Sequence, residues 1–287
     1  MKDYIICTDS ACDIRADVLK AWKVPCMNLT FKFDGDDREY TESDIAIKDF
    51  YNKMRSGAVV KTAAINPDTF KSAFEAILKE GKNVLYLGFS SGLSTTFNSA
   101  RIASEELSES YPDRKIIVVD TLCASAGQGL ILYLALKKQQ EGASMEETAA
   151  YAEALVPKLC HWFTVDDLVY LKRGGRVSPA VAFVGTVLGI KPVLHVDNEG
   201  HLISKSKARG RKAALGALLQ KYDELAVDKK GVVFICNADC SDDASYLKTE
   251  LETKYGAKVE LITDIGPVIG AHAGPGTIAV FFIGTER

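Results

Sequence analysis

The chain has 287 residues, of which 47% are apolar and 25% charged, and its formal net charge is -3. The length predicts two domains, the composition excludes a disordered or collagen-like chain, and the charge excludes a bulk attraction to nucleic acid or to an anionic membrane. No apolar run reaches the roughly 20 residues of a membrane helix, and the N-terminus lacks the apolar stretch and cleavage site of a leader. We therefore expect no transmembrane segment and no signal peptide.

The seven cysteines are widely spaced and form no C-x-x-C pair. Disulfides and a zinc site are not expected, and free thiols fit a protein of the reducing cytoplasm. The sequence also lacks the glycine-rich phosphate loops of nucleotide-binding proteins and the H-E-x-x-H zinc motif. We expect no cofactor and no bound metal.

Strands alternate with helices in the first half of the chain. Strands are predicted over 4–8, 27–33, 83–89 and 115–120, and helices over 14–22, 43–56, 67–81, 95–110, 124–141 and 144–158. Ser43, Asn66 before Pro67, and Ser144 with Glu147 are the expected helix start signals. Continuously apolar strands between helices predict a parallel-sheet α/β/α domain over 1–158, with ligands bound beyond the carboxyl ends of the strands.

The pattern changes near residue 160. We expect an antiparallel hairpin over 193–204, then a helix (209–226), a strand (231–238), a helix (241–255) and two strands (258–263 and 277–284). These elements predict a second, smaller α+β domain over 159–287 that carries a mixed or antiparallel sheet. Between the domains, residues 179–190 are apolar on every side, which indicates either a buried core helix or the wall of an apolar tunnel.

A cluster of hydroxyl groups follows the strand at 83–89. Five of the seven residues from Ser90 to Thr96 carry a hydroxyl, which exceeds what one helix cap needs. Hydroxyls and free N–H groups at a helix N-terminus bind a carboxylate or a phosphate without a lysine. Ser91, Ser94 and Thr95 are therefore candidate ligand-binding residues.

The same segment supports a second hypothesis, a serine hydrolase. Residues 88–92 match G-x-S-x-G, and Ser90, Asp264 and His272 follow one another in the order of a catalytic triad. Four residues separate the motif from its helix, however, and no oxyanion-hole segment precedes it. Hydrolysis ranks second, and no catalytic residue is assigned.

Two other regions carry candidate functional residues. Residues 266–276 contain four glycines and two prolines around His272, which predicts a fixed, tight loop that presents the histidine to a ligand. Residues 61–67 read as a connector in which Thr62, taken alone, is structural. Two basic clusters, at 171–176 and 205–212, are solvated faces or docking sites for an acidic partner.

Taken together, these segments resemble the DegV family of bacterial fatty-acid-binding proteins. The matching pieces are Thr8-Asp9-Ser10, Lys61-Thr62, Ser90-Ser91-Gly92-Leu93-Ser94, Asp120-Thr121, Leu171-Lys172-Arg173-Gly174-Gly175-Arg176, Lys191-Pro192 and Gly270-Ala271-His272-Ala273-Gly274-Pro275-Gly276. They occur in the family's order and span almost the whole chain.

The resemblance implies one long-chain fatty acid buried between two domains, in a carrier that is not itself an enzyme. Its carboxylate would be held by Thr62 and Ser94, with His272 close by. A partly cationic imidazole at His272 would offset part of the cost of burying the carboxylate. Some members present this carboxyl group to a fatty-acid kinase that makes acyl-phosphate for phospholipid synthesis. The expected docking residues for such a kinase are the arginines of the two basic clusters: Arg173, Arg176, Arg209 and Arg211.

Overall fold

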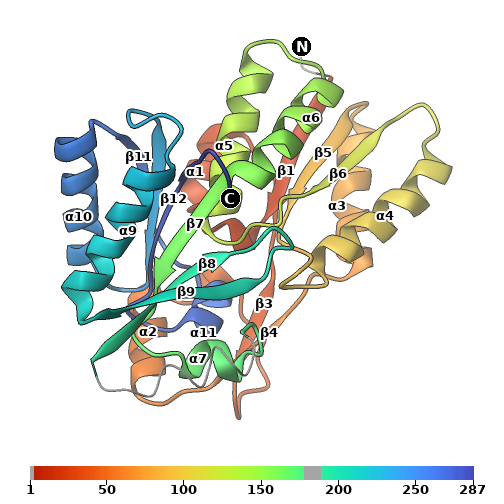
Figure 1. Ribbon diagram of the computed structural model, residues 1–287. Coiled ribbons are helices and arrows are strands. Elements are labelled where there is room, and N and C mark those ends of the chain that lie inside the picture. Colours follow the sequence, from red (N-terminus) through yellow and green to blue (C-terminus); the bar gives the residue numbers. More distant parts are fainter. Residues whose placement is uncertain (1–2, 178–188) are drawn as a thin grey trace.

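Two large β-sheets and a two-stranded ribbon organise the part of the chain that the computed structural model describes, residues 3–177 and 189–287 (Figure 1). The first sheet has the order β2 (Cys26–Met27), β1 (Tyr4–Asp9), β5 (Asn83–Gly88) and β6 (Ile116–Asp120), and every pair in it is parallel. The predicted parallel sheet is therefore confirmed.

Helices cover both faces of this sheet. The helices of this half are α1 (Ala16–Trp22), α2 (Ile47–Arg55), α3 (Pro67–Lys79), α4 (Thr96–Ser110), α5 (Ala126–Gln140) and α6 (Met145–Leu155). Helix α3 packs on α4, and α5 packs on α6 (Figure 1). Asn66 caps α3, and Ser144 and Glu147 form a capping box on α6, as predicted.

Two local predictions in this half were wrong. Ser43 does not cap a helix, because Thr41 and Asp44 form a capping box around a 3-10 turn (Glu42–Asp44) before α2 begins. The single strand expected over 27–33 is two strands, since Leu29 N–H donates to Ser10 Oγ at the break between them. β2 joins the first sheet, whereas β3 (Thr30–Phe33) pairs with β4 (Val60–Ala63).

The second sheet is mixed, as predicted. Its order is β11 (Lys258–Asp264), β10 (Val232–Asn237), β12 (Ile278–Ile283), β7 (Leu159–Thr164), β8 (Ile190–Val196) and β9 (Leu202–Arg209). Only β10 and β11 are parallel. The expected hairpin is β8–β9, and β7, whose six residues are all buried, was not predicted.

Helix α5 lies between the two sheets. It contacts β5 of the first sheet and β7, β10 and β12 of the second. The other face of the second sheet packs against α9 (Arg211–Leu225) and α10 (Ser241–Glu250), which continues as one π-helical turn, Leu251–Tyr255. One hydrophobic core contains side chains of both sheets, so the two halves share a packed seam.

Two short helices complete the seam, α7 (Val169–Arg173) and α11 (Pro267–Ala273). The prediction of a tight loop over 266–276 was wrong, because seven of these residues form α11. Gly270 lets this helix pack closely against α2, since a Cβ there would lie 2.4 Å from the hydroxyl oxygen of Tyr51. The apolar segment 179–190 falls outside the described residues except for its last two positions, and the boundary at residue 158 stays a prediction.

In the described ranges, no helix combines the length and the apolar composition that crossing a bilayer requires.

Candidate functional site

A cavity of about 530 Å³ lies in the seam between the two sheets. Its lining is mostly apolar and comes from both halves of the chain. The lining residues that bear on function are Thr62, Ser91, Leu93, Ser94, Thr95, Ser125, His161, Phe163, Arg176, Val196, Leu202, Cys236, His272, Thr277, Ala279 and Phe281.

The five predicted ligand-binding residues all line this cavity. Thr62 lies on β4, Ser91 follows β5, Ser94 and Thr95 directly precede α4, and His272 lies in the last turn of α11. Three segments, β4, the loop between β5 and α4, and α11, thus meet in one place, although Thr62 and His272 are 210 residues apart. Their role in binding a ligand stays a prediction.

Thr62 and His272 contact each other directly. The distance from Thr62 Oγ1 to His272 Nε2 is 2.8 Å, while His272 Nδ1 is buried and has no hydrogen-bond partner among the described residues. The imidazole packs against the end of α7, where a Cβ on Gly174 would lie 2.1 Å from Nδ1. With Nε2 protonated, the imidazole donates to Thr62, whose own O–H is then free to donate into the cavity.

His272 is neutral at pH 7 in this structure. Burial, and after it the positive charge of Arg176, lower the pKa of His272 to about 4. The expectation of a partly cationic imidazole concerns the site with a bound carboxylate and stays a prediction. The positive charge at this end of the cavity comes from Arg176.

Arg176 lies at the mouth of the cavity. It is solvent-exposed and also lines the cavity, and its guanidinium donates to the carbonyls of Leu93 (3.2 Å) and Gly174 (2.5 Å). The sequence placed Arg176 in a basic cluster but could not predict that its side chain points to the cavity mouth. Ser91 and Thr95 are exposed at the same end, so the polar end of the cavity is its mouth.

Ser94 has a second role as a helix cap. Its Oγ accepts from the N–H of Thr96 (3.2 Å) and lies 2.9 Å from the hydroxyl of Thr96. Thr95 makes no side-chain capping bond. The segment therefore caps α4 and still leaves hydroxyl groups at the cavity mouth.

The floor of the cavity was missed from the sequence. Cys236, Ala279 and Phe163 are cross-strand neighbours on one face of the second sheet, and Phe281 and His161 form the next pair along the same strands. All five side chains are buried. The run of β7, which is apolar except for His161 and Thr164, was the one local signal that could have revealed part of this wall.

The serine-hydrolase hypothesis finds no support in the geometry. Ser90 is 0% exposed and does not line the cavity; its Oγ donates to the carbonyl of Gly200 (3.0 Å) and accepts from the N–H of Gly92 (3.1 Å). His272 contacts Thr62 rather than Ser90. Asp264 accepts from the side-chain amide of Asn237 (3.4 Å).

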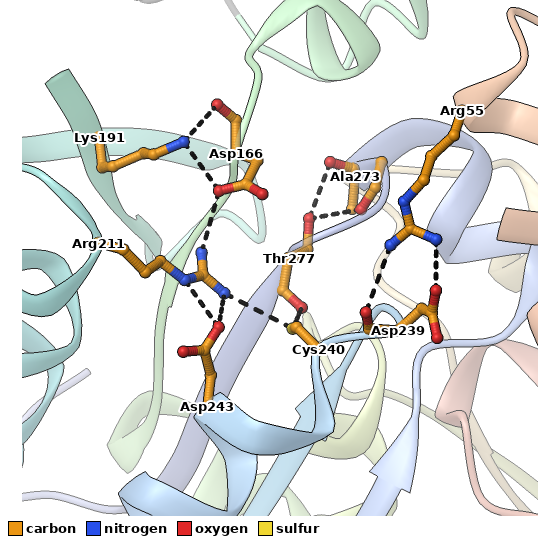
Figure 2. A network of polar contacts seen from close by, with 10 residues as sticks. Arg55, Asp166, Lys191, Arg211, Asp239, Cys240, Asp243, Ala273 and Thr277 are labelled. Atoms are coloured by element: carbon orange, nitrogen blue, oxygen red, sulfur yellow. Dashed lines mark hydrogen bonds and ion pairs between the residues drawn. The ribbon is translucent and has the colours of Figure 1, made fainter. Parts of the chain in front are cut away.

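The other predicted docking arginines differ in their surroundings. Arg211 pairs with Asp243 (2.7 Å) and Asp166 (3.5 Å) in the network that Figure 2 shows. The guanidinium of Arg173 lies 5.8 Å from the ring centre of Tyr170. Arg209 is exposed at the end of β9. Their role in docking stays a prediction.

Across the described residues, no three or more His, Cys, Asp or Glu side chains are grouped so that they could hold a metal ion.

This combination of two sheets around an apolar cavity with a polar mouth defines a small-molecule-binding protein of the α/β class. Comparison with known proteins identifies the family. The family model described as "Uncharacterised protein, DegV family" matches residues 4–285, and the chain belongs to that family.

Relatives and solved structures match over the full length. A DegV domain-containing protein of Clostridium perfringens is 43% identical over 100% of this chain and 99% of its own. A DegV family protein of Thermus thermophilus, described as binding fatty acid, has a TM-score of 0.88 at 32% identity, covering 98% of this chain and 99% of its own. A DegV lipid-binding protein of Thermotoga maritima has a TM-score of 0.86 at 31% identity, with both chains covered completely.

Proposed function

We propose that this protein binds one long-chain fatty acid, with its carboxylate at the cavity mouth and its acyl chain against the floor. The observation that carries the proposal is the polarity gradient of a single cavity. Its mouth holds the hydroxyls of Thr62 and Ser94 and the charge of Arg176, and its floor is the buried sheet face with Ala279 and Phe281.

The size of the cavity fits such a ligand. Its volume of about 530 Å³ falls within the ~300–1,000 Å³ that is typical of pockets for small molecules. Burying about 14 methylenes gains on the order of 11 kcal/mol at ~0.8 kcal/mol each before the costs of ordering the chain. The apolar tail therefore supplies most of the affinity.

The carboxylate adds orientation. A fully buried, unpaired charge would cost several kcal/mol, but a head group at the exposed mouth keeps part of its water. The hydroxyls of Thr62 and Ser94 can donate to it, and the α4 N-terminus and Arg176 are electrostatically favourable neighbours. Neutral His272 acts by orienting the Thr62 hydroxyl.

The relatives support the same ligand class. The Thermus thermophilus protein is described as binding fatty acid, and the Thermotoga maritima protein as binding lipid. A second Thermotoga maritima protein, 30% identical with a TM-score of 0.84, is described as revealing a fatty-acid-binding function.

Mass spectrometry of lipid extracted from the purified native protein tests the proposal. We expect a long-chain fatty acid at near-stoichiometric level. The delipidated protein should then bind an added fatty acid more tightly than its methyl ester. Absence of co-purified fatty acid together with no binding by the delipidated protein would refute the proposal.

The proposal extends to a carrier role without catalysis by this chain, in the cytoplasm, where its seven free cysteines would stay reduced.

A carboxylate at the mouth is accessible to a kinase that phosphorylates it, and exposed Arg173, Arg176 and Arg209 are the docking candidates. Arg173→Glu combined with Arg209→Glu should abolish acyl-phosphate formation by a cognate kinase and leave fatty-acid affinity unchanged. Unimpaired phosphorylation of that double variant would contradict their role in docking. Arg211 serves poorly in this test, because its ion pairs are structural.

A further inference from the structure

The helix that carries His272 depends on anchors outside itself. Helix α11 has seven residues, and a helix that short is not stable through its own hydrogen bonds. At its N-terminus, the N–H of Gly266 donates to the carboxylate of Asp13 (2.9 Å). The position of His272 relative to Thr62 is therefore set by what holds the two ends of α11.

Thr277 holds the C-terminal end. Its hydroxyl lies 2.8 Å from each of the carbonyl oxygens of Ala273 and Gly274, which directly follow His272 (Figure 2 draws these contacts). Carbonyl groups at a helix C-terminus lack partners within the helix, and the single O–H of Thr277 is within reach of two of them, so it can donate to either one or be shared between both. Thr277 is only 2% exposed.

Thr277 is itself fixed from its other side. Its carbonyl accepts from the N–H of Ala238 (2.8 Å) and from the thiol of Cys240 (3.3 Å). The sulfur of Cys240 lies 3.5 Å from the guanidinium of Arg211, which Asp243 and Asp166 hold in ion pairs (Figure 2). A continuous set of contacts thus runs from the surface ion pairs to the end of α11.

The close fit of the following residues leaves this end of the helix little room to shift. Gly274 has a φ of +82°, and a Cβ there would lie 2.3 Å from the ring of Tyr170 on α7. A Cβ on Gly276 would lie 2.1 Å from the carboxylate of Asp166. The segment therefore approaches both neighbours at distances that only glycine permits.

We propose that Thr277 is a positioning residue for the head-group site: its hydroxyl fixes the end of α11 and thereby holds His272 Nε2 at hydrogen-bond distance from Thr62. Thr277 acts through His272 rather than on the carboxylate. The binding part of this inference rests on the proposed function, whereas the His272–Thr62 contact can be measured without any ligand.

The test compares Thr277→Val, which removes the hydroxyl at nearly constant volume, with Thr277→Ser, which keeps it. Thr148→Val is the matched control, because Thr148 is a fully buried threonine on α6 whose hydroxyl pairs with Tyr4 (2.8 Å) outside the cavity. Each variant is delipidated and titrated with a long-chain fatty acid and with its methyl ester. The ¹⁵N chemical shifts of the His272 imidazole are recorded in the empty protein.

We expect Thr277→Val to weaken fatty-acid binding by about tenfold, the equivalent of one hydrogen bond, and to shift the Nε2 resonance. Methyl-ester binding should change by less than about twofold, because the ester has no charged carboxylate and accepts only weaker, neutral hydrogen bonds at this site. Thr277→Ser and Thr148→Val should retain both the wild-type affinities and the wild-type resonance.

An unchanged Nε2 resonance in Thr277→Val would overturn the inference. Equal losses of affinity for the fatty acid and for its methyl ester would also overturn it, because they would show that Thr277 only lines the cavity. If Thr277→Val does not fold, Thr277→Ala replaces it with the same expected outcomes. Failure of the wild-type protein to bind fatty acid would refute the proposed function instead, and the resonance shift in the empty protein would still decide the role of Thr277.

Discussion

The mouth and the floor of the cavity differ in how the chain builds them. The mouth consists of four short segments whose polar residues stand out in the sequence, with Thr62, Ser94 and His272 among them. The floor consists of buried strand residues that resemble any other core residues until the sheet is assembled. The floor accounts for affinity and the mouth for orientation, so changes in the two regions should have different signatures.

The largest effect is expected at the floor. Ala279→Phe places a ring in the cavity beside Phe163 and Cys236, its cross-strand neighbours. Displacing about four methylenes removes about 3 kcal/mol at ~0.8 kcal/mol each, so long-chain affinity should fall by roughly a hundredfold. Isothermal titration with fatty acids of two lengths measures this loss.

A short fatty acid that does not reach the floor is the internal control and should keep its affinity for the folded variant. Equal losses for long and short chains would contradict the assignment of the floor to the acyl tail.

At the mouth, single substitutions should cost less. Thr62→Val and Ser94→Ala each remove one hydrogen bond to a carboxylate that stays partly hydrated, so fatty-acid affinity should fall by about tenfold in each. Methyl-ester affinity, measured in the same titrations, should change little. Unchanged fatty-acid affinity in both variants would show that the carboxylate does not bind at Thr62 and Ser94.

The protonation state of His272 reports on the mouth of the cavity alone. Its pKa is lowered to about 4 in the empty site, and a carboxylate bound at the mouth should raise it by favouring the imidazolium. His272 then binds its proton more tightly in the liganded protein than in the empty protein. Its protonation therefore strengthens fatty-acid binding as the pH falls toward the raised pKa. NMR titration of the imidazole with and without ligand measures the shift.

Arg176→Gln should also raise the pKa of His272 in the empty protein, because it removes the cation that helps to lower it. A His272 pKa that stays at about 4 in the loaded wild-type protein would mean that the carboxylate lies elsewhere.

The smallest effect on binding is expected for Ser90→Ala. Ser90 is four residues from Ser94, but its hydroxyl joins the loop after β5 to the β8–β9 hairpin through Gly200. Losing this buried bond should lower the free energy of unfolding by about 1 to 2 kcal/mol, with fatty-acid affinity unchanged within about twofold. Denaturant unfolding and titration measure the two quantities, and a fluorophosphonate probe should leave Ser90 unlabelled.

Local sequence predicted most elements and the polar candidates, because helix caps such as Asn66 and Ser144 act within one turn. It failed where the partner is distant. β4, which carries Thr62, read as a connector because it is extended only through pairing with β3. α11 read as a loop because the glycines within and beside it serve close packing, as Gly270 does against Tyr51. The direction of Arg176 depends on the fold of α7 and the loop that contains Leu93.

A crystal structure with a long-chain fatty acid brominated at its methyl end, located by anomalous scattering, would show directly which end of the cavity holds the acyl tail. We expect the bromine against the sheet face that carries Ala279 and Phe281, and the carboxylate within hydrogen-bond distance of Thr62 or Ser94. Bromine at the mouth beside Arg176, or outside the cavity altogether, would contradict this expectation.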